Sequence, residues 1–87
     1  KQMKYKKTKI KETMISVRTS WFTEDGMYQL VQTAMKGRDR KRYHVLTRTH
    51  DGGWVDLNDK QYSTMLAAEG AIEEHRANLK DETYHTT

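Results

Sequence analysis

Basic side chains are concentrated in and around a turn in the middle of this chain, which two β-prone segments flank. Five fall within seven positions: Lys36, Arg38, Arg40, Lys41 and Arg42. Arginine holds its N–H donors in a fixed fork that engages two acceptors of a phosphate or of a guanine edge, whereas lysine supplies a point charge. We predict a nucleic-acid-binding surface, with duplex DNA as the expected ligand, from these five residues together with Arg18, His44 and Arg48. The alternative is a charged hairpin tip that only prevents aggregation at a sheet edge.

The distribution of charge along the chain supports the first interpretation. The formal net charge of +4 divides into +9 over residues 1–50 and −5 over residues 51–87. A basic half and an acidic half together make an electrostatic dipole, which attracts a polyanion to one side of the molecule and repels it from the other.

Other chemistries find little support in the residue types. The chain has no cysteine, so a zinc site would need histidines and carboxylates alone, and His44 and His50 lie too far apart on an extended segment to share one ion. Asp51, Asp56 and Asp59 cluster near a glycine turn, where turn chemistry explains them. We therefore expect no catalytic residues, no metal, no cofactor and no small-molecule substrate.

A second candidate surface would bind protein rather than nucleic acid. Aromatic side chains anchor many protein interfaces, and acidic helix residues complement a basic partner. The residues concerned are Phe22, Trp54, Glu69, Glu73 and Glu74. The alternative is that the aromatic residues complete the core and the acidic residues face solvent.

The predicted basic residues are expected to lie on strands and in the turns between them. Alternation of apolar and polar residues from Met14 to Phe22, and again over residues 42–49, is typical of half-buried strands, and residues 54–57 add a short one. Residues 27–36 fit either a strand or a helix. We favour a strand because Tyr28, Val31 and Thr33 prefer it and turn residues lie on both sides.

The last expected element is a helix. Asn58 with Gln61, or Ser63 or Thr64 alone, would cap it. Gly70 either weakens this helix by about 1 kcal/mol or marks a close approach to the sheet.

These elements predict an α+β fold: an antiparallel meander of three or four strands with one C-terminal helix packed on one face. Residues 1–13 are expected to form a flexible basic arm, residues 14–80 a single domain and residues 81–87 a loose tail. The longest apolar runs are only a few residues, so we expect no membrane span and a cytoplasmic location. The predicted core consists of Ile15, Val17, Trp21, Leu30, Tyr43, Val45, Met65, Ala68, Ile72 and Leu79.

The order of motifs resembles the small arm-binding, AP2-like domains of phage and transposon tyrosine integrases. The likeness lies in a strand with Trp21, a strand with Tyr28, the GRDRKR hairpin, and a Tyr62-Ser63-Thr64 step with Ala68 into the helix. The segment HDGGWVDLND is an addition to that pattern. The resemblance implies a three-stranded sheet in the major groove of DNA, with the hairpin arginines near the backbone.

The same plan is similar to that of small bacteriophage proteins that bind host proteins. From sequence we expect a non-enzymatic, phage or mobile-element protein that binds nucleic acid through the basic hairpin and sheet face. The first alternative is a phage-encoded inhibitor of a host protein, such as a CRISPR nuclease. The second alternative is a structural or decoration subunit.

Overall fold

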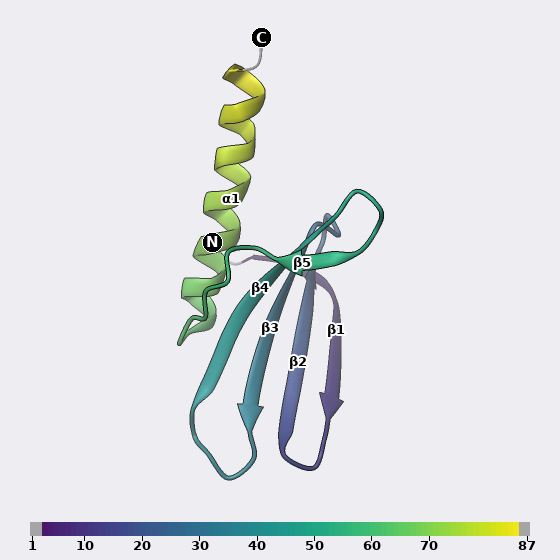
Figure 1. The fold of residues 1–87 in the computed structure, drawn as a ribbon, viewed down its shortest axis with the longest axis vertical. Coiled ribbons are helices and arrows are strands. Elements are labelled where there is room, and N and C mark those ends of the chain that lie inside the picture. Colours follow the sequence, from purple (N-terminus) through teal and green to yellow (C-terminus); the bar gives the residue numbers. More distant parts are fainter. Residues whose placement is uncertain (1–2, 86–87) are drawn as a thin grey trace.

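The computed structural model describes residues 3–85, and within that range the side chains of residues 3–79. Five strands precede one helix along the chain (Figure 1). The elements are β1 (Tyr5–Glu12), β2 (Ser16–Thr23), β3 (Tyr28–Met35), β4 (Lys41–Arg48), β5 (Trp54–Asp56) and α1 (Met65–His85). The strands form one antiparallel sheet in the order β1-β2-β3-β4-β5. The predicted α+β meander with one C-terminal helix is confirmed, with five strands instead of three or four.

The additional strand is β1, which replaces most of the flexible arm that we expected over residues 1–13. It pairs with β2 along its whole length, with a bulge between Tyr5 and Lys7. The high lysine content hid an alternating pattern, in which Thr8 and Ile10 lie on one face while Lys9 and neighbouring lysines lie on the other. Residues 1 and 2 of the expected arm lie outside the described residues.

The ambiguous segment over residues 27–36 is a strand, as predicted. β3 pairs with β2 on one side and with β4 on the other, so it is the central strand of the sheet. Turns bound it at Gly26 (φ 73°) and Gly37 (φ 82°), a left-handed conformation that glycine adopts without strain. Turn chemistry at both ends therefore outweighs the helical spacing within the segment.

Helix α1 begins after Thr64, one of the predicted caps. The Thr64 hydroxyl accepts a hydrogen bond of 3.1 Å from the backbone N–H of Ala67, which satisfies one of the free donors of the first turn. The helix continues to His85, past residue 81 where we expected the tail to begin, and residues 86–87 lie outside the described range. Gly70 is exposed and a Cβ there would meet nothing within 4 Å, so of the two alternatives for Gly70 the close approach to the sheet is wrong.

Most of the core lies between α1 and one face of the sheet, while the fully buried Val31 lies on the other face. Tyr28, Leu30, Val45, Ala68 and Ile72 are buried, and Trp21, Tyr43 and Met65 pack against them half-buried. These residues confirm most of the predicted core, and Val17 is half-buried further along the same face.

Two predicted core residues are exposed. Ile15 is 66% exposed because it belongs to the turn between β1 and β2, outside the paired strands. Leu79 is 44% exposed and lies in the C-terminal half of α1, which extends beyond the sheet (Figure 1). Both predictions were wrong because alternation and helical spacing do not reveal how much of a side chain the rest of the fold covers.

A polar cluster at the β2–β3 turn fastens the helix to the sheet. The buried Thr23 hydroxyl donates to Asp25 Oδ1 (2.6 Å) and accepts from the Tyr28 N–H (3.1 Å). Arg76 pairs with Asp25 (2.8 Å), and its guanidinium lies over the Tyr28 ring at 5.1 Å. His75 Nδ1 is 2.7 Å from the Tyr28 hydroxyl. Two residues of α1 are thus tied to one end of β3.

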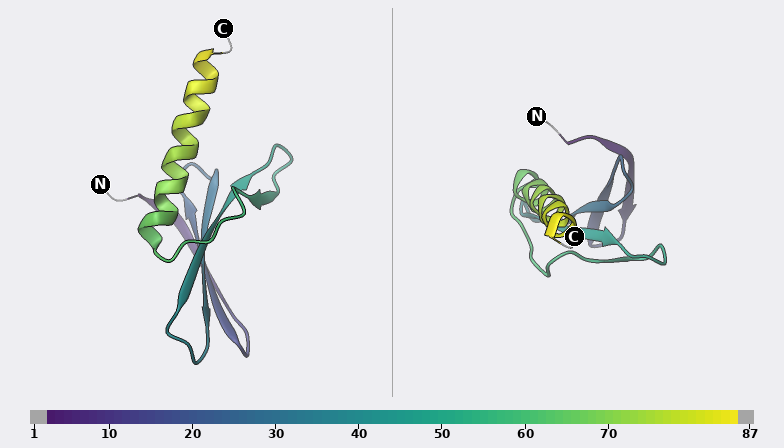
Figure 2. Two further views of the ribbon diagram at one scale, coloured as in Figure 1. Left: turned by 60° about the vertical axis from the view of Figure 1, so that its left-hand side comes forward. Right: turned by 90° about the horizontal axis from the view of Figure 1, so that it is seen from above.

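The helix covers only part of one sheet face. The C-terminal part of α1 projects beyond one end of the sheet. The β1–β2 and β3–β4 hairpins project beyond the other end of the helix, in the opposite direction (Figures 1 and 2). The molecule is elongated, with extents of 52 × 25 × 24 Å. No helix in the described part of the chain has the length and apolar character needed to cross a membrane.

Candidate nucleic-acid interface

The sheet face opposite the helix, here called the open face, carries all the predicted basic residues of the strands except Lys41. Directly opposed residues of antiparallel strands share a face. The register therefore places three rows across the open face. These rows are Lys7–Phe22–Gln29–Leu46–Asp56, then Lys9–Ser20–Val31–His44, and then Lys11–Arg18–Thr33–Arg42.

The third row is the most basic and lies nearest the hairpin tips. Lys11, Arg18 and Arg42 stand on three of its four strands. Since neighbouring strands are about 4.8 Å apart, the row spans about 14 Å of backbone from β1 to β4. All three side chains are exposed.

The turn between β3 and β4 extends this basic row. Arg38, Arg40, Arg42 and His44 together line a hollow of about 430 Å³ on this side of the hairpin. Arg42 Nη1 donates to Gln61 Oε1 at 2.8 Å, which orients that guanidinium along the edge of β4. We call the following residues the basic surface: Lys11, Arg18, Arg38, Arg40, Arg42 and His44.

The lysine and arginines of the basic surface form no ion pair among the described residues. The structure contains two ion pairs among its described residues, Lys36 with Glu12 (2.6 Å) and Arg76 with Asp25 (2.8 Å), and neither involves the basic surface. Positive side chains held on one face without acidic partners create a potential that attracts anions.

The surroundings of His44 lower the pKa of its imidazole. Burial, followed by the positive charge of Arg18, lowers the pKa of His44, and Asp56 offsets the shift only in part. A histidine whose pKa lies below its ordinary value of about 6.5 is mainly neutral at pH 7. His44 therefore offers hydrogen bonds rather than charge when no anion is bound.

Three of the predicted binding residues lie apart from the basic surface. Lys41 pairs with Ala34 in a row on the helix-facing side, because it alternates with Arg42. Lys36 sits in the turn and is partly neutralised by Glu12. Arg48 lies on the open face but farther from the tips, with its guanidinium 5.2 Å from the Trp54 ring centroid. The other five predicted residues all belong to the basic surface.

The predicted protein-binding residues divide between two faces. Phe22 and Trp54 pack edge to face on the open face, with ring centroids 5.8 Å apart. Glu69 lies on the helix and accepts a hydrogen bond from the Tyr5 hydroxyl, and burial followed by this bond raises the pKa of Tyr5. Glu73 and Glu74 are exposed on α1. No single surface unites the aromatic pair with these carboxylates.

Sequence reasoning missed the contribution of β1 to the open face. Lys7, Lys9 and Lys11 alternate along β1 on the face that carries Arg18 of β2 and Arg42 of β4, and Lys11 is directly opposed to Arg18. The alternation is visible in the sequence, but the high lysine content of the segment favours a flexible arm.

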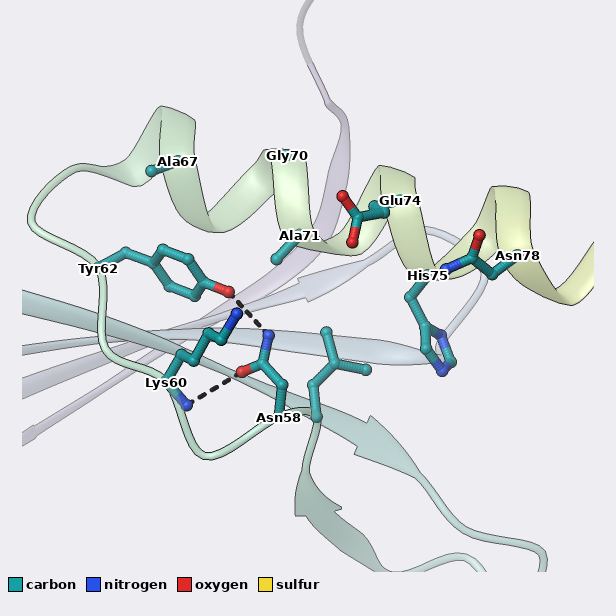
Figure 3. Close-up of a pocket in the computed structure, with 10 residues that line it drawn as sticks. Asn58, Lys60, Tyr62, Ala67, Gly70, Ala71, Glu74, His75 and Asn78 are labelled. Carbon is teal, nitrogen blue, oxygen red and sulfur yellow. Dashed lines mark hydrogen bonds between the residues drawn. The ribbon is translucent and has the colours of Figure 1, made fainter.

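A second hollow, of about 480 Å³, lies between α1 and the loop after β5 (Figure 3). Asn58 bridges two neighbours there: its side chain donates to the Tyr62 hydroxyl (2.7 Å) and accepts from the Lys60 N–H (3.1 Å). Lys60 and Glu74 bring opposite charges to this hollow. Its mixed character does not match a polyanion, and we assign no function to it.

Comparisons with known protein families, with curated proteins and with solved structures found no match to this chain.

Proposed function

We propose that this protein is a non-enzymatic nucleic-acid-binding module that contacts the phosphate backbone through its basic surface. The observation that carries the proposal is the position of Lys11, Arg18 and Arg42 in one row of the open face, continued by Arg38 and Arg40 at the hairpin tip. Clustered Lys and Arg on one face are the electrostatic signature of nucleic-acid binding.

Charge segregation along the molecule supports binding by the hairpin end. Residues 11–18 and 35–42 hold seven Lys/Arg and two acidic residues, a net charge of +5, while α1 has a net charge of −3. The hairpin tips and the helix project in opposite directions (Figure 1). A polyanion is therefore attracted to the tips and repelled from the helix.

The dimensions of the sheet favour phosphate contacts over flat insertion into a groove. Five strands at about 4.8 Å spacing are about 19 Å wide, whereas the major groove of B-DNA is about 12 Å wide. A two-stranded ribbon such as the β3–β4 hairpin fits the groove, but the whole open face does not. We propose that the basic surface follows the phosphate backbone, and that the hairpin tips rather than the whole open face approach a groove.

Salt dependence tests the proposal. Five phosphate contacts predict a slope of about −4.5 for log K against log salt on duplex DNA, or about a 500-fold loss of affinity from 50 to 200 mM salt. Fluorescence anisotropy with duplex DNA, single-stranded DNA and RNA would measure the slope and identify the preferred form. Absence of binding to all three at about 50 mM salt would refute the proposed function.

A double substitution locates the site. Arg40→Ala with Arg42→Ala should reduce the slope to about −2.7, because each lost phosphate contact removes about 0.9. The matched control is Lys4→Ala with Lys60→Ala, which removes the same charge at exposed positions outside the basic surface. Equal slopes for the two double variants would show that net charge alone, and not the basic surface, determines binding.

A further inference from the structure

The turn between β1 and β2 presents apolar side chains to solvent at the most basic end of the molecule. Met14 is 94% exposed and Ile15 is 66% exposed, and Met35 at the end of β3 is 42% exposed. Isolated exposed apolar residues are common on protein surfaces. These three differ because they occupy adjoining hairpin ends, where the net charge is +5.

This turn is held in one conformation by its own hydrogen bonds. The Thr13 hydroxyl accepts from the N–H of Ser16 (3.0 Å) and from that of Ile15 (3.3 Å), and the Thr13 N–H donates to the Ser16 carbonyl (2.8 Å). The Lys36 N–H donates to the Ile15 carbonyl (2.8 Å), which joins the turn to the neighbouring hairpin. Met14 is therefore presented by a preorganised backbone, and little conformational freedom is lost when it is buried.

Cations flank the apolar tip. Lys11 and Arg18 are directly opposed on the strands that lead into the turn, and Arg38 and Arg40 lie on the adjoining hairpin. Figures 1 and 2 show the two hairpins side by side, with their tips at the same end of the sheet. An apolar projection between positive side chains is complementary to the base stack between two phosphate backbones.

Resting on the function proposed above, we propose that Met14, supported by Ile15, is a wedge that inserts between base pairs of duplex DNA from the minor groove and bends the duplex. Methionine and isoleucine are among the side chains that unstack base steps in this way. Successive base pairs are about 3.4 Å apart, and an aliphatic chain requires a further gap of about 3.5–4 Å. The step must therefore open to about twice its normal separation, which kinks the duplex toward the major groove.

Bending is the property that separates a wedge from backbone contact alone. A duplex of about 30 base pairs, labelled at both ends, reports a bend of about 20–90° as increased energy transfer. A 2-aminopurine placed within the duplex brightens when its step is unstacked. We expect both signals to rise when the wild-type protein binds.

Met14→Ala should abolish both signals, reduce affinity by roughly 3- to 10-fold and leave the salt slope unchanged, because no charge is removed. Met27→Ala is the matched control, since Met27 is 45% exposed in the turn between β2 and β3, at the other end of these strands. It should bend DNA as the wild type does. Circular dichroism would verify that both variants fold.

Each other outcome overturns a defined part of the account. DNA binding without bending by the wild type, or undiminished bending by Met14→Ala, would refute the wedge and leave the proposed function intact. Binding to anionic phosphatidylserine vesicles without binding to DNA would refute both, and would assign the apolar tip to a lipid surface. Absence of nucleic-acid binding in the salt series would refute the proposed function itself.

Discussion

Substitution of Thr23 by valine tests how the helix is fastened to the sheet. Valine has the shape of threonine but lacks the hydroxyl, which is fully buried here and serves both Asp25 and the Tyr28 N–H. A buried N–H left without a partner costs about 1–3 kcal/mol. Asp25 retains the Met27 N–H and Arg76 as partners, so the main loss falls on Tyr28.

We expect Thr23→Val to lower the free energy of unfolding by about 2 kcal/mol. A chain of 87 residues has a total stability of about 4–13 kcal/mol, so this loss is a large fraction. In a domain of this size it corresponds to a fall in Tm of about 8–16 °C. Urea titration and thermal melting, both followed by circular dichroism, would measure it.

Thr19→Val is the matched control for this experiment. Thr19 lies on the same strand and is half-buried, and its hydroxyl forms no hydrogen bond within the described part of the chain. It should change stability by less than about 0.5 kcal/mol, since valine suits a strand at least as well. Equal effects of the two substitutions would refute the role of the Thr23 hydroxyl in the turn.

Two further predictions concern the open face. Burial and Arg18 lower the pKa of His44 in the folded state. As the pH falls, His44 is therefore protonated in the unfolded chain before it is protonated in the folded one, and the free energy of unfolding decreases from about pH 7 toward pH 5. His44→Gln should reduce that loss in urea titrations at the two pH values, and an unchanged loss would contradict the burial argument. Arg42→Ala should reduce the salt slope of DNA binding by about 0.9. Lys41→Ala should reduce it by less, because the Lys41 side chain lies on the helix-facing side of the sheet. Equal effects of the two substitutions would contradict the placement of the binding site on the open face.

The strands of the meander were predictable because alternation and turn residues act together over short distances. Gly26 and Gly37 take positive φ at both ends of β3, and Thr64 caps the helix. Each of these signals depends on residues close in sequence, so it can be read before the fold is known.

The ends of the elements were harder to predict because they depend on partners distant in the chain. β1 is a strand because β2 offers it an edge, and no property of its lysine-rich segment reveals that edge. Leu79 fits the apolar face of α1, yet it is 44% exposed. Local pattern gives the type of an element, whereas burial is decided by tertiary packing.

The candidate site was predictable in composition but not in layout. The arginines of the 38–42 segment were evident from their spacing, and alternation correctly separated Arg18 from Val17. Sequence alone did not reveal that Lys11 completes a row with Arg18 and Arg42, because cross-strand register is a long-range property.

Chemical-shift mapping tests the central claim most directly. ¹⁵N-labelled protein would be titrated with a short DNA duplex while backbone amide and arginine Nε signals are followed. The account predicts the largest changes at Lys11, Arg18, the 38–42 hairpin and Met14, with little change at Glu73 and Glu74 on the helix. Changes confined to α1, or no changes at a saturating concentration of duplex, would contradict it.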